Sequence, residues 1–300
     1  MDMIQNKCCR HGANLRRRRR RRRKILRSII FSCSIIAVAV FVAVGSRMIR
    51  SGDGRTNKYD VEAGNNTYDN AVIENSKISE KNKIQNNQSM LDDIMNSTQY
   101  PKQLKDLALK NDEALEFVYD YPAEHVKEHT IDLTEEASMD SVPLFVQWDK
   151  RWGYEKYSGN FFAASGCGPT TLSMVVVYLT HNREASPIAV AKYSKEAGYS
   201  VDGSGSSWTL ISEGCMHYGV KAKAVALDES RMKAELDAGH PIVINVGPGD
   251  FTDTGHFMVI TGYDDEGFSI NDPNSIEKSG KRWLFKNISS QIRAVWSMYV

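Results

Sequence analysis

A cysteine with the surroundings of a nucleophile stands at position 167, in the segment SGCGPT. Pro169 opens a long apolar run there, and proline is favoured in the first turn of a helix. A cysteine at a helix start lies in the partial positive charge of unpaired N–H groups, which stabilises the thiolate. Ser165, Gly166 and Gly168 are small enough for a substrate backbone to approach, and the Cys167 amide can donate to an oxyanion. The segment therefore indicates thiolate chemistry, with a buried packing cysteine as the alternative.

A base and a group to orient it occur in the last third of the chain. His256 opens an apolar, strand-like pattern directly after the glycine-rich segment GPGDFTDTG, and Asp272 follows sixteen residues later, across the turn YDDEGF. Adjacent antiparallel strands can bring such residues side by side, which predicts a Cys–His–Asp site for acyl transfer. Alternatively, His256 is a hydrogen-bonded sheet residue and Asp272 only begins an Asp-Pro turn. Asn271 and Asn274 flank Asp272 and could take its orienting role.

Other polar and aromatic residues receive a structural interpretation. Asp149, Asp250 and Asp253 lie in loops without metal-ligand spacing, and we read them as solvated or turn-forming. The segment GSGS lacks the lysine and the preceding strand of a phosphate-binding loop. Trp148 and Trp152 are expected to be packing residues. We therefore expect no metal and no cofactor.

The elements that must position these residues form an α+β pattern from residue 142 onward. The segment VPLFVQW (142–148) predicts a strand and GPTTLSMVVVYLT predicts a helix ending at residue 180. Further helices are predicted at 187–197, 208–218 and 228–238, and further strands at 221–227, 241–246, 256–264, 267–272 and 294–300. Helices that precede strands favour a helical lobe packed on an antiparallel sheet over a doubly wound fold.

The N-terminal region has a different composition. Residues 1–50 hold 14 Lys and Arg against one acid, so this segment carries +13, whereas the other 250 residues carry −12. Residues 28–46 contain no charge, and nineteen residues in a helix span about the ~30 Å of a bilayer core. We predict a basic cytoplasmic tail at 1–27, a transmembrane helix at 28–46 and an extracytoplasmic remainder, because Lys and Arg stay on the cytoplasmic side. The alternatives are nucleic-acid binding by the arginine run, which we do not favour, and a cleaved signal peptide.

Three further segments follow the apolar run. Residues 47–100 are rich in Asn, Ser, Lys and Glu, which predicts a disordered linker. Residues 101–136 are predicted to form a short helical collar, with a break and cap at Asn111 and Asp112. Residues 137–300 are predicted to form the domain that carries the site.

The cysteine positions exclude a disulfide framework in the exported part. Cys8 and Cys9 precede the apolar run and Cys33 lies in it, so only Cys167 and Cys215 remain. A single bridge between these two is the alternative to free thiols. We expect Cys215 to be a packing residue in the middle of a helix.

The segments VPLFVQWDKRWGYEKYSG, ASGCGPTTLSM, GSGSSW, GPGDFTDTGHFMVITGY and NDPNS resemble the papain-like cysteine peptidases of family thirty-nine, in particular the stand-alone branch found in bacterial membranes. Proteins of this branch resemble the enzymes that cut bacteriocin leader peptides after double glycine. The resemblance runs from about residue 143 to 300. It implies a papain-like fold with Cys167 as nucleophile, His256 as base and acid, and Asp272 as orienter. It also implies Gln147 as second oxyanion donor, although Gln147 precedes Cys167 by twenty residues where about six are common.

These observations predict a membrane-anchored extracytoplasmic cysteine peptidase that acts on peptide or protein substrates through a thioester. A cell-wall peptide hydrolase or amidase on the same fold is the first alternative. A non-catalytic anchored binding module is the second, and the presence of Cys167, His256 and Asp272 argues against it. A transporter-coupled leader peptidase would need a pump on a partner chain.

Overall fold

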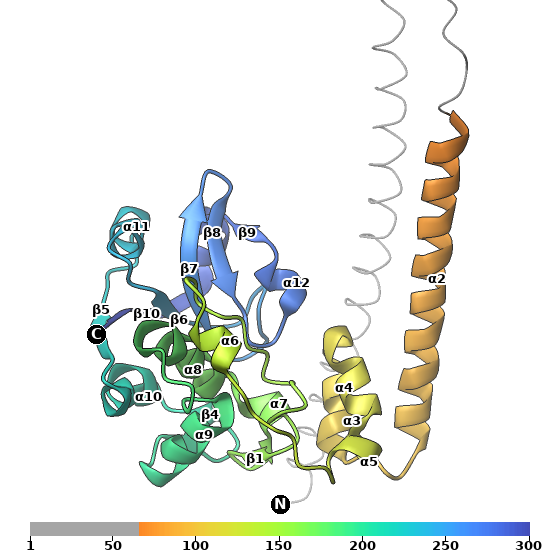
Figure 1. The fold of residues 1–300 in the computed structure, drawn as a ribbon, viewed down its shortest axis with the longest axis horizontal. Coiled ribbons are helices and arrows are strands. Elements are labelled where there is room, and N and C mark those ends of the chain that lie inside the picture. The colour runs from red at the N-terminus through yellow and green to blue at the C-terminus, as the bar shows by residue number, and fades with distance from the viewer. Residues whose placement is uncertain (1–65) are drawn as a thin grey trace, which may run out of the picture. The chain divides into compact units, whose positions relative to one another are not determined.

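The structure, a computed structural model, describes residues 66–300 and the side chains from residue 79 onward (Figure 1). Residues 70–300 form one compact unit. The predicted tail at 1–27, the predicted membrane helix at 28–46 and the first part of the linker lie outside the described residues. Between residues 66 and 300, no helix has both the length and the apolar character needed to span a bilayer.

The region before the predicted domain is helical. It contains helices α2 (Asn66–Asn96), α3 (Lys102–Ala108), η1 (Asp112–Ala114), α4 (Leu115–Tyr119) and α5 (Tyr121–Glu124). We call residues 101–124 the collar. The predicted break and cap are present, because the Asn111 side chain caps η1 by accepting from the Glu113 amide at 3.0 Å.

The prediction of a disordered linker is wrong for residues 66–96, which form α2. The last turns of this helix carry Met90, Leu91 and Ile94, which pack against an apolar cluster that includes Leu104 and Phe117 of the collar. Ile94 is completely buried. One apolar turn at the end of a polar segment is too short to show as a sustained helical period, so the packing that stabilises α2 is not visible in the sequence.

The remaining chain is an α+β domain. Its helices are α6 (Thr134–Ala137), α7 (Phe162–Ser165), α8 (Cys167–Thr180), α9 (Pro187–Glu196), α10 (Thr209–Ser212), η2 (Gly214–Tyr218), α11 (Glu229–Asp237), α12 (Ile276–Ser279), α13 (Phe285–Ile288) and η3 (Ser289–Gln291). Two small hairpins pair β1 (Lys156–Tyr157) with β2 (Asn160–Phe161) and β3 (Ser200–Val201) with β4 (Gly205–Ser206).

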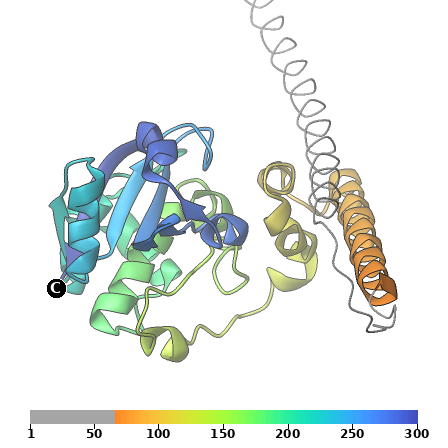
Figure 2. The ribbon, with the colours of Figure 1, turned by 90° about the horizontal axis from the view of Figure 1, so that it is seen from above.

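One antiparallel sheet of six strands holds the second half of the domain. It consists of β5 (Lys221–Ala224), β6 (Ile242–Val246), β7 (His256–Asp264), β8 (Gly267–Asn271), β9 (Arg282–Trp283) and β10 (Ile292–Tyr299), in the order β5-β10-β6-β7-β8-β9. Figure 2 shows the green helices of the first half of the domain beside the blue strands of the second half. The predicted helical lobe on an antiparallel sheet is therefore confirmed.

The sheet is buried on both faces. Val243 of β6 and Val259 of β7 belong to the apolar cluster that holds α8, whereas Ile244 and Met258 belong to the cluster on the other face, with Met232 of α11. Alternation along each strand explains this division, because successive side chains point to opposite faces. The packing of α8 against β7 brings the start of the helix to the start of the strand.

Two predicted elements differ from the structure. Residues 142–148 form no strand, because their backbone groups bond to separate partners: the Gln147 backbone N–H donates to the Pro273 carbonyl at 2.7 Å, and the Val142 and Pro143 carbonyls accept from Asn271 Nδ2. The predicted helix at 208–218 is two helices, α10 and η2. It breaks where Gly214 lies close to Tyr199, since a Cβ atom at this glycine would come within 3.0 Å of the tyrosine ring.

Candidate active site

Cys167 is the first residue of α8, as the sequence pattern predicts, and it is partly buried. The glycines beside it have a structural role of their own. A Cβ atom at Gly166 would come within 2.6 Å of the Phe162 ring, and one at Gly168 within 2.5 Å of Ser206 Oγ. The small residues around the thiol are therefore needed for the packing of α8 as well as for access to the sulfur.

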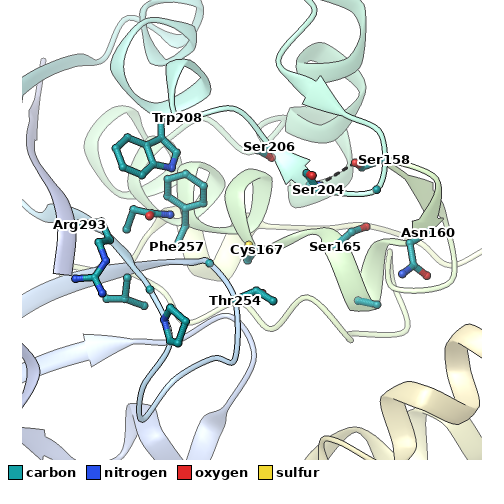
Figure 3. A pocket seen from close by; sticks show the side chains of 18 of the residues that line it. Ser158, Asn160, Ser165, Cys167, Ser204, Ser206, Trp208, Thr254, Phe257 and Arg293 are labelled. Atoms are coloured by element: carbon teal, nitrogen blue, oxygen red, sulfur yellow. Dashed lines mark hydrogen bonds between the residues drawn. The ribbon is translucent and has the colours of Figure 1, made fainter. Parts of the chain in front are cut away.

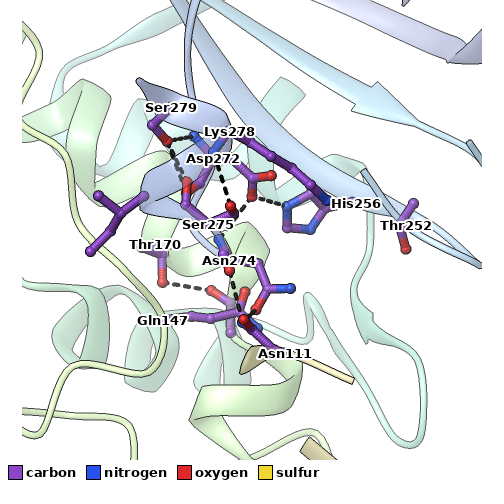
Figure 4. A network of polar contacts seen from close by, with 12 residues as sticks. Asn111, Gln147, Thr170, Thr252, His256, Asp272, Asn274, Ser275, Lys278 and Ser279 are labelled. Atoms are coloured by element: carbon purple, nitrogen blue, oxygen red, sulfur yellow. Dashed lines mark hydrogen bonds and ion pairs between the residues drawn. The ribbon is translucent and has the colours of Figure 1, made fainter. Parts of the chain in front are cut away.

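His256 and Asp272 lie side by side, on β7 and directly after β8. His256 Nε2 is 2.6 Å from Asp272 Oδ1, and both side chains are buried (Figure 4). The same carboxylate oxygen accepts the Asn274 amide at 2.8 Å. Because Nε2 is committed to the carboxylate, Nδ1 is the ring nitrogen that remains for the thiol, and His256 lies close enough to Cys167 to lower the pKa of the thiol. The structure thus brings the three predicted site residues together, with His256 hydrogen-bonded to Asp272 and next to Cys167.

Burial and charge act in opposite directions on this series. Burial raises the pKa of the Cys167 thiol, but the hydrogen bond and the charge of His256 outweigh it, so the pKa lies below its ordinary value. Burial lowers the pKa of His256, whereas the Asp272 carboxylate and the thiolate raise it above its ordinary value. Both shifts favour a thiolate–imidazolium pair, which titrates as one coupled unit.

Gln147 is buried and points at the segment before the nucleophile. Its Nε2 donates to the Ala163 carbonyl at 2.7 Å, and its Oε1 has no hydrogen-bond partner in the described part of the chain. One N–H of the amide remains available after the bond to Ala163. The long segment between Gln147 and Cys167 does loop out and return, through the β1–β2 hairpin.

The two asparagines that flank Asp272 are committed elsewhere. Asn271 Nδ2 donates to the carbonyls of Val142 and Pro143, each at 3.1 Å. The Asn274 side chain accepts from Asn111 Nδ2 at 3.1 Å. Neither side chain is bonded to His256, which leaves Asp272 as the residue in contact with the imidazole.

A cleft of about 700 Å³ opens at the thiol (Figure 3). Cys167 and Ser206 lie in its wall, together with the exposed Trp208 and with Phe257. Arg293 is the charged side chain among the described residues that line it. His256 and Gln147 lie outside the lining.

Sequence analysis missed two polar groups in this wall. Asn245 is buried within β6 and donates through Nδ2 to the His256 carbonyl at 3.2 Å. Ser206 shares a hydrogen bond of 2.6 Å with the hydroxyl of Tyr157. A single asparagine inside the apolar segment PIVINV is a sequence signal that could have indicated Asn245, whereas nothing local marks the contact between Ser206 and Tyr157.

The remaining predicted residues have structural roles. Trp152 is buried and donates to the Val146 carbonyl, and Trp148 packs against the collar cluster, so both are packing residues. Asp250 accepts from Gln291 Nε2 at 2.7 Å and so helps to hold the loop before His256. Asp149 binds Arg151 in its own turn.

Both cysteines of the described region are free thiols. Cys215 is fully buried and packs in the apolar cluster with α8, and burial raises its pKa to about 11. It lies in η2 and not in the middle of an α-helix, but the expected packing role is confirmed. Across residues 66–300, no three His, Cys, Asp or Glu side chains gather as a metal site.

The site combines a thiol at the start of a helix, an imidazole on an antiparallel sheet and a buried carboxylate next to that imidazole. This combination places the protein in the class of α+β proteins with a Cys–His site. Residues 139–300, more than half of the chain, match the sequence profile of the Peptidase_C39 like family, and the chain belongs to that family. The resemblance noted in the sequence is thereby confirmed at the level of the family. No curated protein matches the chain.

Two solved structures match part of the chain. The peptidase domain of Streptococcus ComA, a bi-functional ABC transporter involved in a quorum sensing pathway, is 18% identical with a TM-score of 0.39, and the match covers 53% of this chain and 96% of that one. A protein described as a C39-like peptidase from Bacillus anthracis is 17% identical with a TM-score of 0.34, over 53% of this chain and 95% of the other.

Proposed function

We propose that this protein is a cysteine peptidase that hydrolyses peptide bonds through Cys167, His256 and Asp272. The observation that carries the proposal is the buried His256–Asp272 pair at 2.6 Å beside the Cys167 thiol, at the edge of a cleft. Membership of the Peptidase_C39 like family supports the same reaction class.

The proposed reaction has two acyl-transfer steps. The Cys167 thiolate attacks the carbonyl carbon of the scissile bond, and the imidazolium of His256 gives its proton to the leaving amine. The thioester that forms is then hydrolysed by a water molecule: His256 takes its proton, the hydroxyl adds to the acyl carbon, and the Cys167 thiolate is released beside the imidazolium. Asp272 holds the imidazole and stabilises its charge throughout.

The oxyanion is proposed to be held by the Cys167 amide and by Gln147. The hydrogen bond from Gln147 to the Ala163 carbonyl fixes the side-chain amide and leaves its second N–H as a donor. A donor of this kind contributes on the order of 10² to 10³ in kcat in other acyl-transfer enzymes. Gln147→Ala should therefore lower kcat more than it raises KM.

The test is peptide hydrolysis by the purified full-length chain. Acidic, neutral and basic peptides should be compared, because Arg293 is the charge in the cleft wall. The wild-type chain and Cys215→Ser should cut peptides, whereas Cys167→Ala should not. If Cys167→Ala cut peptides as fast as the wild type, the proposal would be contradicted. Release of fragments from purified peptidoglycan without cleavage of peptides would favour the cell-wall amidase instead.

We also propose that residues 28–46 anchor the enzyme in the membrane, with the basic tail inside and the domain outside. The support is the uncharged run of nineteen residues next to a cluster of arginines. Protease added to intact cells should remove the domain. Complete protection of the domain until the cells are lysed would contradict this orientation.

A further inference from the structure

The loop that carries Asp272 is held from outside the region that matches the family. Residues 272–277 contact the collar, although the family match begins only at residue 139. Figure 4 shows Asn111 next to Asn274, within the network that leads to Asp272 and His256. The side chains that bind this loop are those of Asn111 and Glu113, two residues apart in the collar.

Asn111 binds the residue that supports the carboxylate. Its Nδ2 donates to the Asn274 carbonyl at 2.9 Å and to Asn274 Oδ1 at 3.1 Å. The Trp148 indole donates to the same carbonyl at 3.2 Å. The backbone N–H of Asn274 in turn donates to Asp272 Oδ1, so Asn274 links the collar to the orienting carboxylate.

Glu113 binds the next residues of the loop with both oxygens of its carboxylate. Oε2 accepts the amides of Ile276 at 2.8 Å and Glu277 at 3.0 Å, and Oε1 accepts the hydroxyl of Ser275. Hydrogen bonds to a charged acceptor are stronger than neutral ones. Asp272 and Ser275 pair through their backbones, so they belong to the same turn. By holding Ser275 and the two residues after it, Glu113 therefore also fixes the position of Asp272.

We propose that Asn111 and Glu113 are positioning residues of the active site, and that the collar is a part of the catalytic machinery. They act through the loop at 272–277, which keeps Asp272 Oδ1 on His256 Nε2. This inference rests on the proposed function for its effect on catalysis. When the loop is loosened, the hydrogen bond that His256 Nε2 donates to Asp272 weakens, the pKa of His256 falls, and the Cys167 thiolate loses its imidazolium partner.

The experiment measures the thiolate directly. The full-length chain is labelled with iodoacetamide between pH 5 and 10, and the rate of Cys167 alkylation is followed by mass spectrometry. In Glu113→Ala the alkylation profile should move to higher pH, with a rate at pH 6 about tenfold below wild type and a rate near pH 10 that is unchanged. With peptide substrate, kcat should fall about tenfold to hundredfold while KM stays nearly constant, as expected for a misplaced catalytic group.

Glu116→Ala is the matched control. It removes a carboxylate from α4 of the same collar, but Glu116 is exposed and makes no contact with the loop, so the profile should match wild type. Glu113→Gln keeps a side chain of the same length with one acceptor oxygen and should restore part of the alkylation rate. Thermal melting of each variant shows whether it is folded at the assay temperature.

Asn111→Asp tests the proposal if Glu113→Ala does not fold. Aspartate keeps the oxygen that caps η1 but removes the Nδ2 donor to Asn274. The same shift of the alkylation profile is expected. Wild-type profiles in folded Glu113→Ala and Asn111→Asp, or an equal shift in Glu116→Ala, would overturn the proposal. If the wild type is alkylated rapidly at pH 6 but cuts no peptide, the proposed function fails, and the alkylation comparison still decides the role of the collar.

Discussion

The two free cysteines of the described region have opposite environments. Cys167 begins α8 beside an imidazole that a carboxylate keeps charged, which holds its pKa below the ordinary value despite burial. Cys215 packs in an apolar cluster, and burial raises its pKa to about 11. The charge of the partner therefore decides which thiol reacts.

Selective alkylation at low pH follows from this difference. Iodoacetamide at pH 6 should label Cys167 rather than Cys215 and abolish peptide hydrolysis in proportion, because the pKa of Cys167 is lowered whereas burial raises that of Cys215. His256→Ala should slow the labelling, and Cys215→Ser should leave it unchanged. Mass spectrometry identifies the labelled residue, and labelling of Cys215 at pH 6 with loss of activity would move the nucleophile to that position.

The pH dependence of the same pair has a defined sign. Activity should rise with pH as the thiolate forms, at a pH below the ordinary range of cysteine, because the pKa of Cys167 is lowered. It should fall only when the imidazolium loses its proton, above the ordinary range of histidine, because the pKa of His256 is raised. The kcat/KM profile should therefore be a wide bell, and these limbs report the coupled pair.

Removal of the orienting carboxylate should affect catalysis more than binding. Asp272→Ala is expected to lower kcat by about 10-fold to 10⁴-fold, by analogy with other triads, and to move the alkaline limb to lower pH. Asp272→Asn is the companion variant, since it keeps an acceptor for the Asn274 amide. Full activity of Asp272→Ala together with an inactive Asn271→Ala or Asn274→Ala would transfer the role to that asparagine.

At the scale of elements, the site depends on close packing around the start of α8. The helix lies against β7 and touches β4, where Ser206 faces Gly168. Ser206 is itself held by the hydroxyl of buried Tyr157, so the wall of the cleft cannot move away without breaking that bond. The glycine is thus required by its neighbours.

Gly168→Ala should consequently destabilise the domain and disturb the cleft. The new Cβ would stand 2.5 Å from Ser206 Oγ, and overpacking of this kind costs about 1 to 3 kcal/mol. Chemical denaturation measures the loss, and kcat/KM for a peptide should fall in parallel. Gly262→Ala is the control, because no atom lies within 4 Å of the corresponding Cβ position. An unchanged stability of Gly168→Ala would contradict this account of the helix start.

At the scale of the whole molecule, residues that precede the region matching the family pack against it and extend the apolar core. The apolar cluster of the collar includes Phe161 and Ala163 of the segment before Cys167, as well as Ile94 of α2. The long helix is therefore attached to the domain through the collar. The same collar binds the loop of Asp272 through Asn111 and Glu113.

Truncation of Ile94 should show how much this attachment contributes. Ile94 is 0% exposed, and replacement of a buried isoleucine by alanine typically costs 2 to 5 kcal/mol, so Ile94→Ala should lower the free energy of unfolding by about this amount. Ile84→Ala on the same helix is the control, since Ile84 is 64% exposed and should change nothing measurable. Equal stabilities of the two variants would mean that α2 does not pack on the collar in solution.

The sequence by itself indicated the three residues of the candidate site, because each stands at a recognisable local boundary. Cys167 precedes a proline in the first turn of a helix, His256 begins a strand after a glycine-rich loop, and Asp272 directly follows the next strand. Short-range patterns also predicted five strands of the main sheet and the helix that carries the thiol. Each of these features depends on residues that lie close together in the sequence.

Only the tertiary structure decided the contacts between distant segments. Asn111 and Glu113 reach the loop of Asp272 across more than 160 residues, and no local pattern marks either of them. The absence of a strand at 142–148 and the helical state of 66–96 have the same origin, because the partners of these segments lie in the loop after β8 and in the collar. Hydrogen bonds and apolar contacts depend on which surfaces meet after folding, and hydrophobic periodicity along the chain does not contain that information.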